Sequence, residues 1–290
     1  MTDATDNHPP SDPEAPTPEQ RANLRAHIFN EMAEVQQLAA APNSALHKDD
    51  QFLKPFGKTV HQLVINRLLS ALDHLHLTAY SLEQSEGPLI FSQYSLLRAA
   101  LAGASTAHWI VSRDTTERRK RALKLTYYDL EQEVNFSKDV RKIPIREGKP
   151  NPKIAAADKL IAGAPERLDA MYEEYCSLLR SQKKTKMPDP ANFGRVEEIG
   201  IITEMGKALR KFEKIPNELE LVLQYRLMSG FVHNCTWATY TGARVRTYPS
   251  EISPMVEIAG NPVNIYRAAG TAVHIVRIAK ERTRELAEKP

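Results

Sequence analysis

Apolar residues recur along this chain at the three- and four-residue spacing of helices. Between residues 57 and 84 they fall on one stripe, at Val60, Val64, Leu68, Leu72, Leu75 and Ala79, which predicts an amphipathic helix. The break Glu86-Gly87-Pro88 follows, and Leu89 to Val111 is predicted as the next helix. Because the connection is short, we expect these two helices to form an antiparallel hairpin.

The same periodicity continues to the C-terminus. Asp114 and Glu117 have the spacing of a capping box, which predicts the start of a polar helix that runs to about Val140. Further helices are predicted over 21–40, 153–181 with a break near 163–165, 193–213, 218–240 and 263–287, with loops at 143–152 and 183–190 and a loop or small hairpin at 241–262. No set of alternating strands is present. We therefore predict an all-α fold, an antiparallel helical bundle.

The first residues have a different character. Five prolines stand among Asp, Glu and Thr before residue 19, with no apolar cluster to bury. Such a segment favours disorder. We predict a disordered acidic tail over 1–18 and a single helical domain over 19–290.

Composition narrows the class of protein. Hydrophobic residues make up 42% and charged residues 26%, which is ordinary for a globular protein, and the net charge of +3 requires any basic surface to be local. Two cysteines exclude a disulfide framework or a Cys-rich zinc module and favour the reducing cytoplasm. Without an apolar run of the ~20 residues that span a bilayer, and without a secretion signal, no membrane partner is expected.

The helix predicted over 89–111 is apolar or small around its whole circumference, which is typical of a central helix. Ala100, Gly103 and Ala107 form a stripe without bulk, where another helix can approach closely. Arg98 interrupts this pattern, and a buried guanidinium requires an anionic or carbonyl partner. Two interpretations remain open. Arg98 pairs with a carboxylate of a neighbouring helix, which we favour, or it contacts a phosphate group.

The helix predicted over 218–240 is also apolar on opposite sides, and it also contains strongly polar residues. Leu219, Val222, Leu223, Gly230 and Trp237 lie on one line, and Leu221, Tyr225, Met228 and Val232 cover the opposite side. Arg226 and His233 lie on the first line, where the pattern favours leucine. Residues that break a local rule in this way mark candidate functional positions. The alternative is a core histidine with its hydrogen bonds satisfied and a paired arginine.

The spacing of Arg226 and His233 is not distinctive by itself. An arginine precedes a histidine by six or seven residues at four places, 21–27, 67–74, 226–233 and 267–274. The pairs at 67–74 and 267–274 lie opposite the apolar stripes of their helices, which predicts solvated faces. Only the pair at 226–233 lies on an apolar stripe.

The segment from Tyr225 to Asn234 resembles the marker of the HEPN superfamily, in which Arg is followed by four to six residues and then His on a late helix. It is similar to an uncharacterised HEPN-like branch with a Tyr-Arg, a Ser and a Val-His at these spacings. That branch has an earlier Arg-bearing apolar helix that ends in Trp, which the segment from Tyr94 to Trp109 resembles. The resemblance extends over about 57–285 and implies a homodimer with the site across its interface.

The activity that the resemblance implies is that of a metal-independent endoribonuclease, a toxin or an effector of phage defence or stress. Arg226 and His233 would be the catalytic residues, and Arg98, Ser229 and Asn234 would bind the substrate. RNA, a second copy and an antitoxin or regulatory protein are the implied partners. No cofactor is expected, and no metal, because His74-x-His76 and His233-x-Cys235 lack a same-face helical spacing. The alternatives are a non-catalytic HEPN-like module that binds RNA or a ligand, and an unrelated helical regulator or scaffold.

Four basic clusters are candidates for contact with RNA. They lie at 118–121, 138–153, 180–186 and 207–214. The alternative for each cluster is a solvated helix end or loop.

Overall fold

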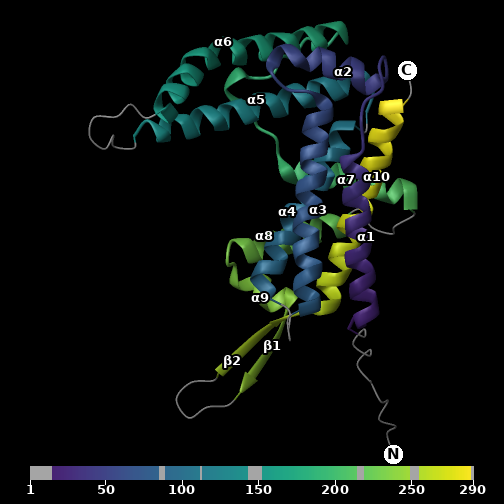
Figure 1. Ribbon diagram of the computed structural model, residues 1–290. Coiled ribbons are helices and arrows are strands. Elements are labelled where there is room, and N and C mark those ends of the chain that lie inside the picture. Colours follow the sequence, from purple (N-terminus) through teal and green to yellow (C-terminus); the bar gives the residue numbers. More distant parts are fainter. Residues whose placement is uncertain are drawn as a thin grey trace, which may run out of the picture.

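The computed structural model describes residues 15–84, 89–111, 113–142, 152–248 without 214–218, and 255–288 (Figure 1). Its helices are α1 (Pro18–Gln36), α2 (Ala45–Leu53), α3 (Val60–Gln84), α4 (Ile90–Val111), α5 (Thr115–Val140), α6 (Pro152–Ser181), α7 (Glu198–Glu213), α8 (Leu219–Val232), α9 (Thr236–Gly242) and α10 (Pro262–Glu288). Short 3-10 turns lie at Lys54–Phe56 and Pro190–Asn192. Strands β1 (Ala243–Tyr248) and β2 (Met255–Gly260) pair in antiparallel register, with Ala243 opposite Gly260. The prediction of an all-α protein is confirmed for the described residues, and the hairpin lies within 241–262, where a loop or a small hairpin was predicted.

The predicted hairpin of α3 and α4 is confirmed by contacts at both ends of the pair. The Gln93 side-chain amide donates to the Ser81 hydroxyl at 2.8 Å. Further along, a β-carbon at Gly103 would lie 3.1 Å from the carbonyl oxygen of Arg67. Residue numbers rise on one helix as they fall on the other, so the helices are antiparallel. Gly103 permits the close approach that its small-residue stripe predicted.

Helix α4 is central, as predicted. It packs against α3, α5, α7, α8 and α10. Tyr94, Leu97, Leu101 and Ile110 are fully buried on it. Tyr94 stacks on Phe231 of α8 with the ring centroids 4.4 Å apart, which adds to the stabilisation from apolar burial.

Helices α5 and α6 form a second long pair. Figure 1 shows them side by side across one end of the molecule, while β1 and β2 project from the opposite end. The predicted start of α5 is confirmed, because the Asp114 carboxylate accepts the backbone N–H of Glu117 at 3.0 Å. The predicted break at 163–165 is wrong, since α6 runs through Pro165. Pro165 is exposed, so the backbone carbonyl that loses its helical partner can be hydrated.

The helix predicted to reach Tyr240 ends at Val232 instead. Asn234 has a left-handed φ of 54°. Its N–H bonds to the Phe231 carbonyl at 3.1 Å, and the N–H of Cys235 bonds to the Gly230 carbonyl at 2.8 Å. This pair of bonds is a Schellman motif, and asparagine tolerates its left-handed position better than most residues. The chain then folds back as α9, whose Ala238 Cβ would lie only 2.6 Å from a β-carbon at Gly230.

Other boundaries differ by a few residues from the predictions. Helix α1 begins at Pro18 and is capped by Thr17 and Gln20 in a capping box. The predicted tail lies outside the described residues up to position 14. Helix α2 was not predicted, and α7 begins at Glu198 and not at Phe193. Phe193 lies before the helix and is buried among the rings of Tyr127, Tyr172 and Tyr175. Among the described helices, none combines the length and the apolar character that crossing a bilayer requires.

Candidate functional site

Arg226, in the middle of α8, and His233, just after its C-terminal end, both lie on the open surface. Arg226 is exposed on the helix, and His233 is exposed in the turn that follows it. Neither side chain forms a hydrogen bond or an ion pair with any residue that the structure describes. The alternative of a satisfied core histidine beside a paired arginine is therefore wrong. Both groups are accessible to a ligand.

Apolar side chains are exposed on the same part of the molecule. Leu219 and Leu223 on α8, and Trp237 and Tyr240 on α9, are between 52% and 68% exposed. The inward side of α8 carries buried Leu221, Tyr225 and Met228. The sequence suggested a central helix, because α8 is apolar all round, but α8 is not central. It packs one side against α4 and α7 and presents the other to solvent. Grouped exposure of large apolar residues is typical of an interaction surface.

Ser229 and Asn234, the other predicted substrate-binding residues near α8, lie close to His233 at the end of this helix. The Ser229 carbonyl accepts the backbone N–H of His233 at 3.0 Å, and the Ser229 side chain is partly exposed. Asn234 is exposed and ends the helix through its left-handed backbone. We call the exposed group Leu219, Leu223, Arg226, Ser229, His233, Asn234, Trp237 and Tyr240 the α8 face.

Arg98 is engaged elsewhere. Its guanidinium donates to the Glu198 carboxylate and to the Tyr225 hydroxyl, each at 2.8 Å, and it lies over the Tyr225 ring, 5.2 Å from the centroid. Glu198 comes from the first turn of α7. This is the carboxylate from a neighbouring helix that one of the two interpretations predicted. The structure links Arg98 with the inward-facing Tyr225 and not with Arg226 or His233.

The Arg98 cluster joins three helices. Tyr225 donates its hydroxyl proton to Glu198, and the pair lies between α4, α7 and α8. Burial, followed by the hydrogen bond to the Glu198 carboxylate, raises the pKa of Tyr225 to about 12. The phenol therefore remains protonated at neutral pH and serves as a donor. The cluster links the inward side of α8 to α4 and α7.

One of the basic clusters proposed for RNA contact lies inside the protein. Arg118 and Lys120 are buried. Arg118 and Arg119 each donate to the Asp49 carboxylate, at 2.8 and 2.9 Å, and Lys120 pairs with Glu117. Both sequence-based readings of this cluster, an RNA contact and a solvated helix end, are wrong. The apolar positions of α5 did not reveal it, because the carboxylate partner comes from α2.

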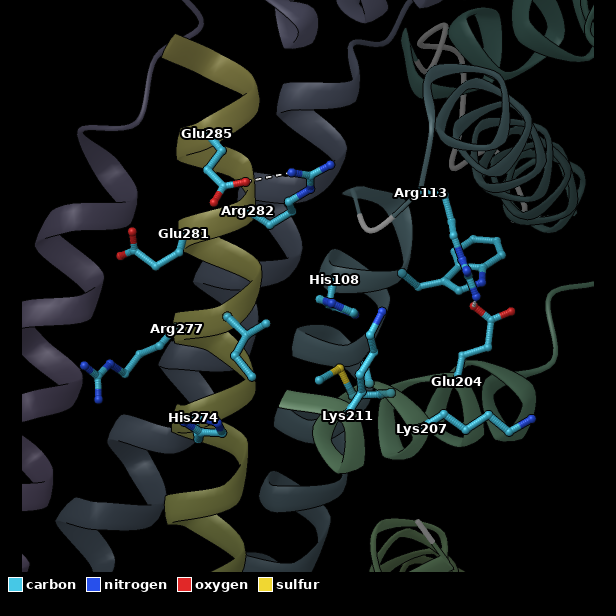
Figure 2. Close-up of a pocket in the computed structure, with 14 residues that line it drawn as sticks. His108, Arg113, Glu204, Lys207, Lys211, His274, Arg277, Glu281, Arg282 and Glu285 are labelled. Atoms are coloured by element: carbon cyan, nitrogen blue, oxygen red, sulfur yellow. Dashed lines mark hydrogen bonds and ion pairs between the residues drawn. The ribbon is translucent and has the colours of Figure 1, made fainter. Parts of the chain in front are cut away.

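A second candidate site was not recognised in the sequence. A cavity of about 810 Å³ opens between the C-terminal half of α4, α7 and α10, and Figure 2 shows His108, Lys211 and Arg282 among the residues that line it. His108 is a polar residue on the same all-apolar helix that drew attention to Arg98. Because a polar residue that interrupts an apolar helix marks a candidate functional position, the sequence could have identified His108 as it identified Arg98. Lys207 and Lys211 of the basic cluster 207–214 supply part of the cavity wall.

Comparison with known proteins gives no family for this chain. No family model, no curated protein and no solved structure matches it. Within the described residues, no three His, Cys, Asp or Glu side chains gather in a group that could hold a metal ion.

Proposed function

We propose that this protein is a HEPN-like, metal-independent endoribonuclease whose site forms when the α8 faces of two copies meet. The observation that supports the proposal is the exposure of Arg226 and His233, free of ionic partners in the described part of the chain, among exposed apolar residues. An exposed arginine and an exposed histidine without ionic partners are suited to binding and cleaving a phosphodiester.

The proposed chemistry uses ordinary roles of these side chains. His233 takes the proton of a ribose 2′-hydroxyl as general base, or gives a proton to the leaving oxygen as general acid, which suits an imidazole near neutral pH. Arg226 stabilises the charge that develops on the phosphoryl oxygens through paired N–H donors. Ser229 and Asn234 contact the sugar or an exposed base.

Two copies are needed for geometric reasons. Arg226 and His233 are seven residues apart, a rise of ~10.5 Å along a helix, and helical side chains lean toward the N-terminus. Within one chain the guanidinium therefore leans away from the imidazole. A two-fold axis at the α8 face would bring Arg226 of one copy toward His233 of the partner subunit. It would also cover Leu219, Leu223, Trp237 and Tyr240.

We expect purified protein to cleave total RNA in the presence of EDTA. His233→Ala should lower the cleavage rate by about 10²-fold or more, the size of a general acid–base contribution. His74→Ala is the matched control, because His74 follows Arg67 at the same spacing on α3 and its ring bonds to the Ser70 carbonyl of its own helix, at 2.6 Å. Cleavage that survives His233→Ala would remove His233 from the mechanism.

We expect Leu223→Glu to convert a dimer into a monomer, because it places a charge in the proposed contact. Leu223 is already exposed, so folding of the single chain should be unaffected. Mass in solution, measured by light scattering, and RNA cleavage should fall together. Leu77→Glu, at a similarly exposed position on α3, should change neither. A monomeric wild-type protein would contradict the two-fold site.

The non-catalytic alternative uses the same face without cleavage. It would be an RNA-binding module whose affinity falls with salt as phosphate contacts are lost. The observation in its favour is that Arg98 is already paired with Glu198, which leaves fewer basic groups for a reacting phosphate. Binding of RNA to wild-type protein without cleavage would support this alternative. An antitoxin or other regulatory protein that covers the α8 face fits either function.

A further inference from the structure

The cavity between α4, α7 and α10 lies apart from the α8 face and shares none of its residues. Its volume of about 810 Å³ is within the range of small-molecule sites, about 300–1,000 Å³. We infer that it binds a small phosphorylated molecule of nucleotide size. The inference does not depend on the proposed ribonuclease function.

The first argument is charge. Five cationic residues line the cavity against three carboxylates, and the cations are Arg113, Lys207, Lys211, Arg277 and Arg282. All three carboxylates are occupied. Glu204 pairs with Arg121 at 2.9 Å, Glu281 with Arg284 at 2.8 Å, and Glu285 with Arg282 at 2.6 Å.

Two of the lining cations lack an anionic partner. Arg113 pairs with Glu204 at 3.8 Å, Arg282 with Glu285 at 2.6 Å, and Arg277 with Glu31, outside the lining, at 3.5 Å. Lys207 and Lys211 form no ion pair with the described residues. Figure 2 shows the Lys211 side chain extending toward His108 and the Lys207 side chain extending away from it, so Lys211 supplies the unpaired ammonium that would meet a phosphate ester.

The second argument is the state of His108. Its side chain lines the cavity while the residue is only 8% exposed, and the ring makes no hydrogen bond to a residue in the described ranges. Because the ring lines the cavity, its nitrogen atoms are open to a ligand bound there. In Figure 2 the Lys211 side chain reaches from α7 toward the His108 ring. A phosphate oxygen between the two groups would accept from both.

His108 would serve as a neutral donor. Burial, followed by the nearby Arg121 guanidinium, lowers the pKa of His108 to about 4. The ring then carries one N–H at neutral pH and can donate to an anion without being charged itself. The positive charge comes from the lysines and arginines.

The apolar part of the wall indicates a ligand with more than a phosphate. Trp109, Met205, Ala208 and Ile278 line the same cavity. Pockets that combine apolar walls with a few convergent polar groups bind organic molecules through both parts. A sugar or a base attached to the phosphate would contact these side chains.

Calorimetric titration of the full chain tests the inference with ATP, AMP, inorganic phosphate and adenosine. We expect ATP and AMP to bind, ATP more tightly, and adenosine not to bind. Lys211→Gln should weaken ATP binding at least about tenfold, the value of one charge-assisted hydrogen bond. Lys159→Gln, which removes an exposed lysine from α6, should leave the affinity unchanged.

A second variant distinguishes ligand binding in the cavity from nonspecific attraction of the ligand by the net charge of the protein. His108→Phe keeps the approximate size of the ring and removes its donor, so it should weaken ATP binding without changing net charge at neutral pH. Lys211→Gln keeps the test valid if His108→Phe does not fold, because Lys211 is exposed. Absence of ATP and AMP binding at millimolar concentration would overturn the inference. So would equal affinities in wild type, Lys211→Gln and Lys159→Gln, or an RNA oligonucleotide that binds through Lys211 when the small phosphates do not.

Discussion

Asp49→Asn is expected to lower the free energy of unfolding by about 3–5 kcal/mol, the usual cost of removing one partner from a buried ion pair. Asp49 is completely buried on α2, and Arg118, which it binds at 2.8 Å, is 3% exposed. The substitution keeps the shape of the side chain and removes its charge. It leaves the Arg118 guanidinium in the interior without a counter-charge.

Urea denaturation followed by circular dichroism measures this effect. The matched control is Asp139→Asn, because Asp139 pairs with Lys142 at 2.7 Å with both side chains more than two-thirds exposed. That pair should contribute less than about 1 kcal/mol. Arg118→Met added to Asp49→Asn should recover part of the loss by removing the unpaired charge. An equal, small effect of both Asp→Asn changes would contradict the internal role of the basic cluster on α5.

The stability of the protein should also fall on acidification because of His108. The pKa of His108 is lowered to about 4 in the folded protein, first by burial and then by Arg121, whereas in the unfolded chain it is about 6.5. Between these values the unfolded chain binds more protons, so the free energy of unfolding decreases as the pH falls. The contribution of His108 is absent above about pH 7 and reaches about 2 kcal/mol by pH 5.

Comparison with His108→Phe isolates this effect from the other titrating groups. Wild type and variant should be denatured with urea at a series of pH values between 7 and 5. We expect the wild type to lose about 2 kcal/mol more than the variant over this interval. Parallel loss in the two proteins would show that the ring is hydrated in the folded state, which would also weaken the case for a neutral donor in the cavity.

The sequence identified the candidate residues of the α8 face but not their surroundings. Hydrophobic periodicity shows that Leu219, Leu223 and Arg226 share a side of a helix, because this depends only on the 3.6-residue turn. It does not show whether a neighbouring helix covers that side. The Arg98, Glu198 and Tyr225 cluster links α8 to α4 and α7, and its three members come from three helices. Arg226 and His233 lie outside this contact and are exposed.

The end of α8 illustrates a different limit. The apolar pattern continues from Val232 to Trp237, so the sequence predicted one helix through this region. The Schellman motif at Asn234 and the close approach of Ala238 to Gly230 turn the chain instead. An asparagine and a glycine at these positions are compatible with a turn, but they do not require it.

Local spacing by itself determined the helical class, the hairpin of α3 and α4, the central place of α4 and the cap at Asp114. Each of these follows from periodicity or from contacts between residues close in sequence. The cavity around His108, the internal pairing of Arg118 with Asp49 and the solvent exposure of the α8 face were decided only by the tertiary structure. They depend on side chains from segments far apart in the sequence, whose meeting is determined by the packing of whole helices.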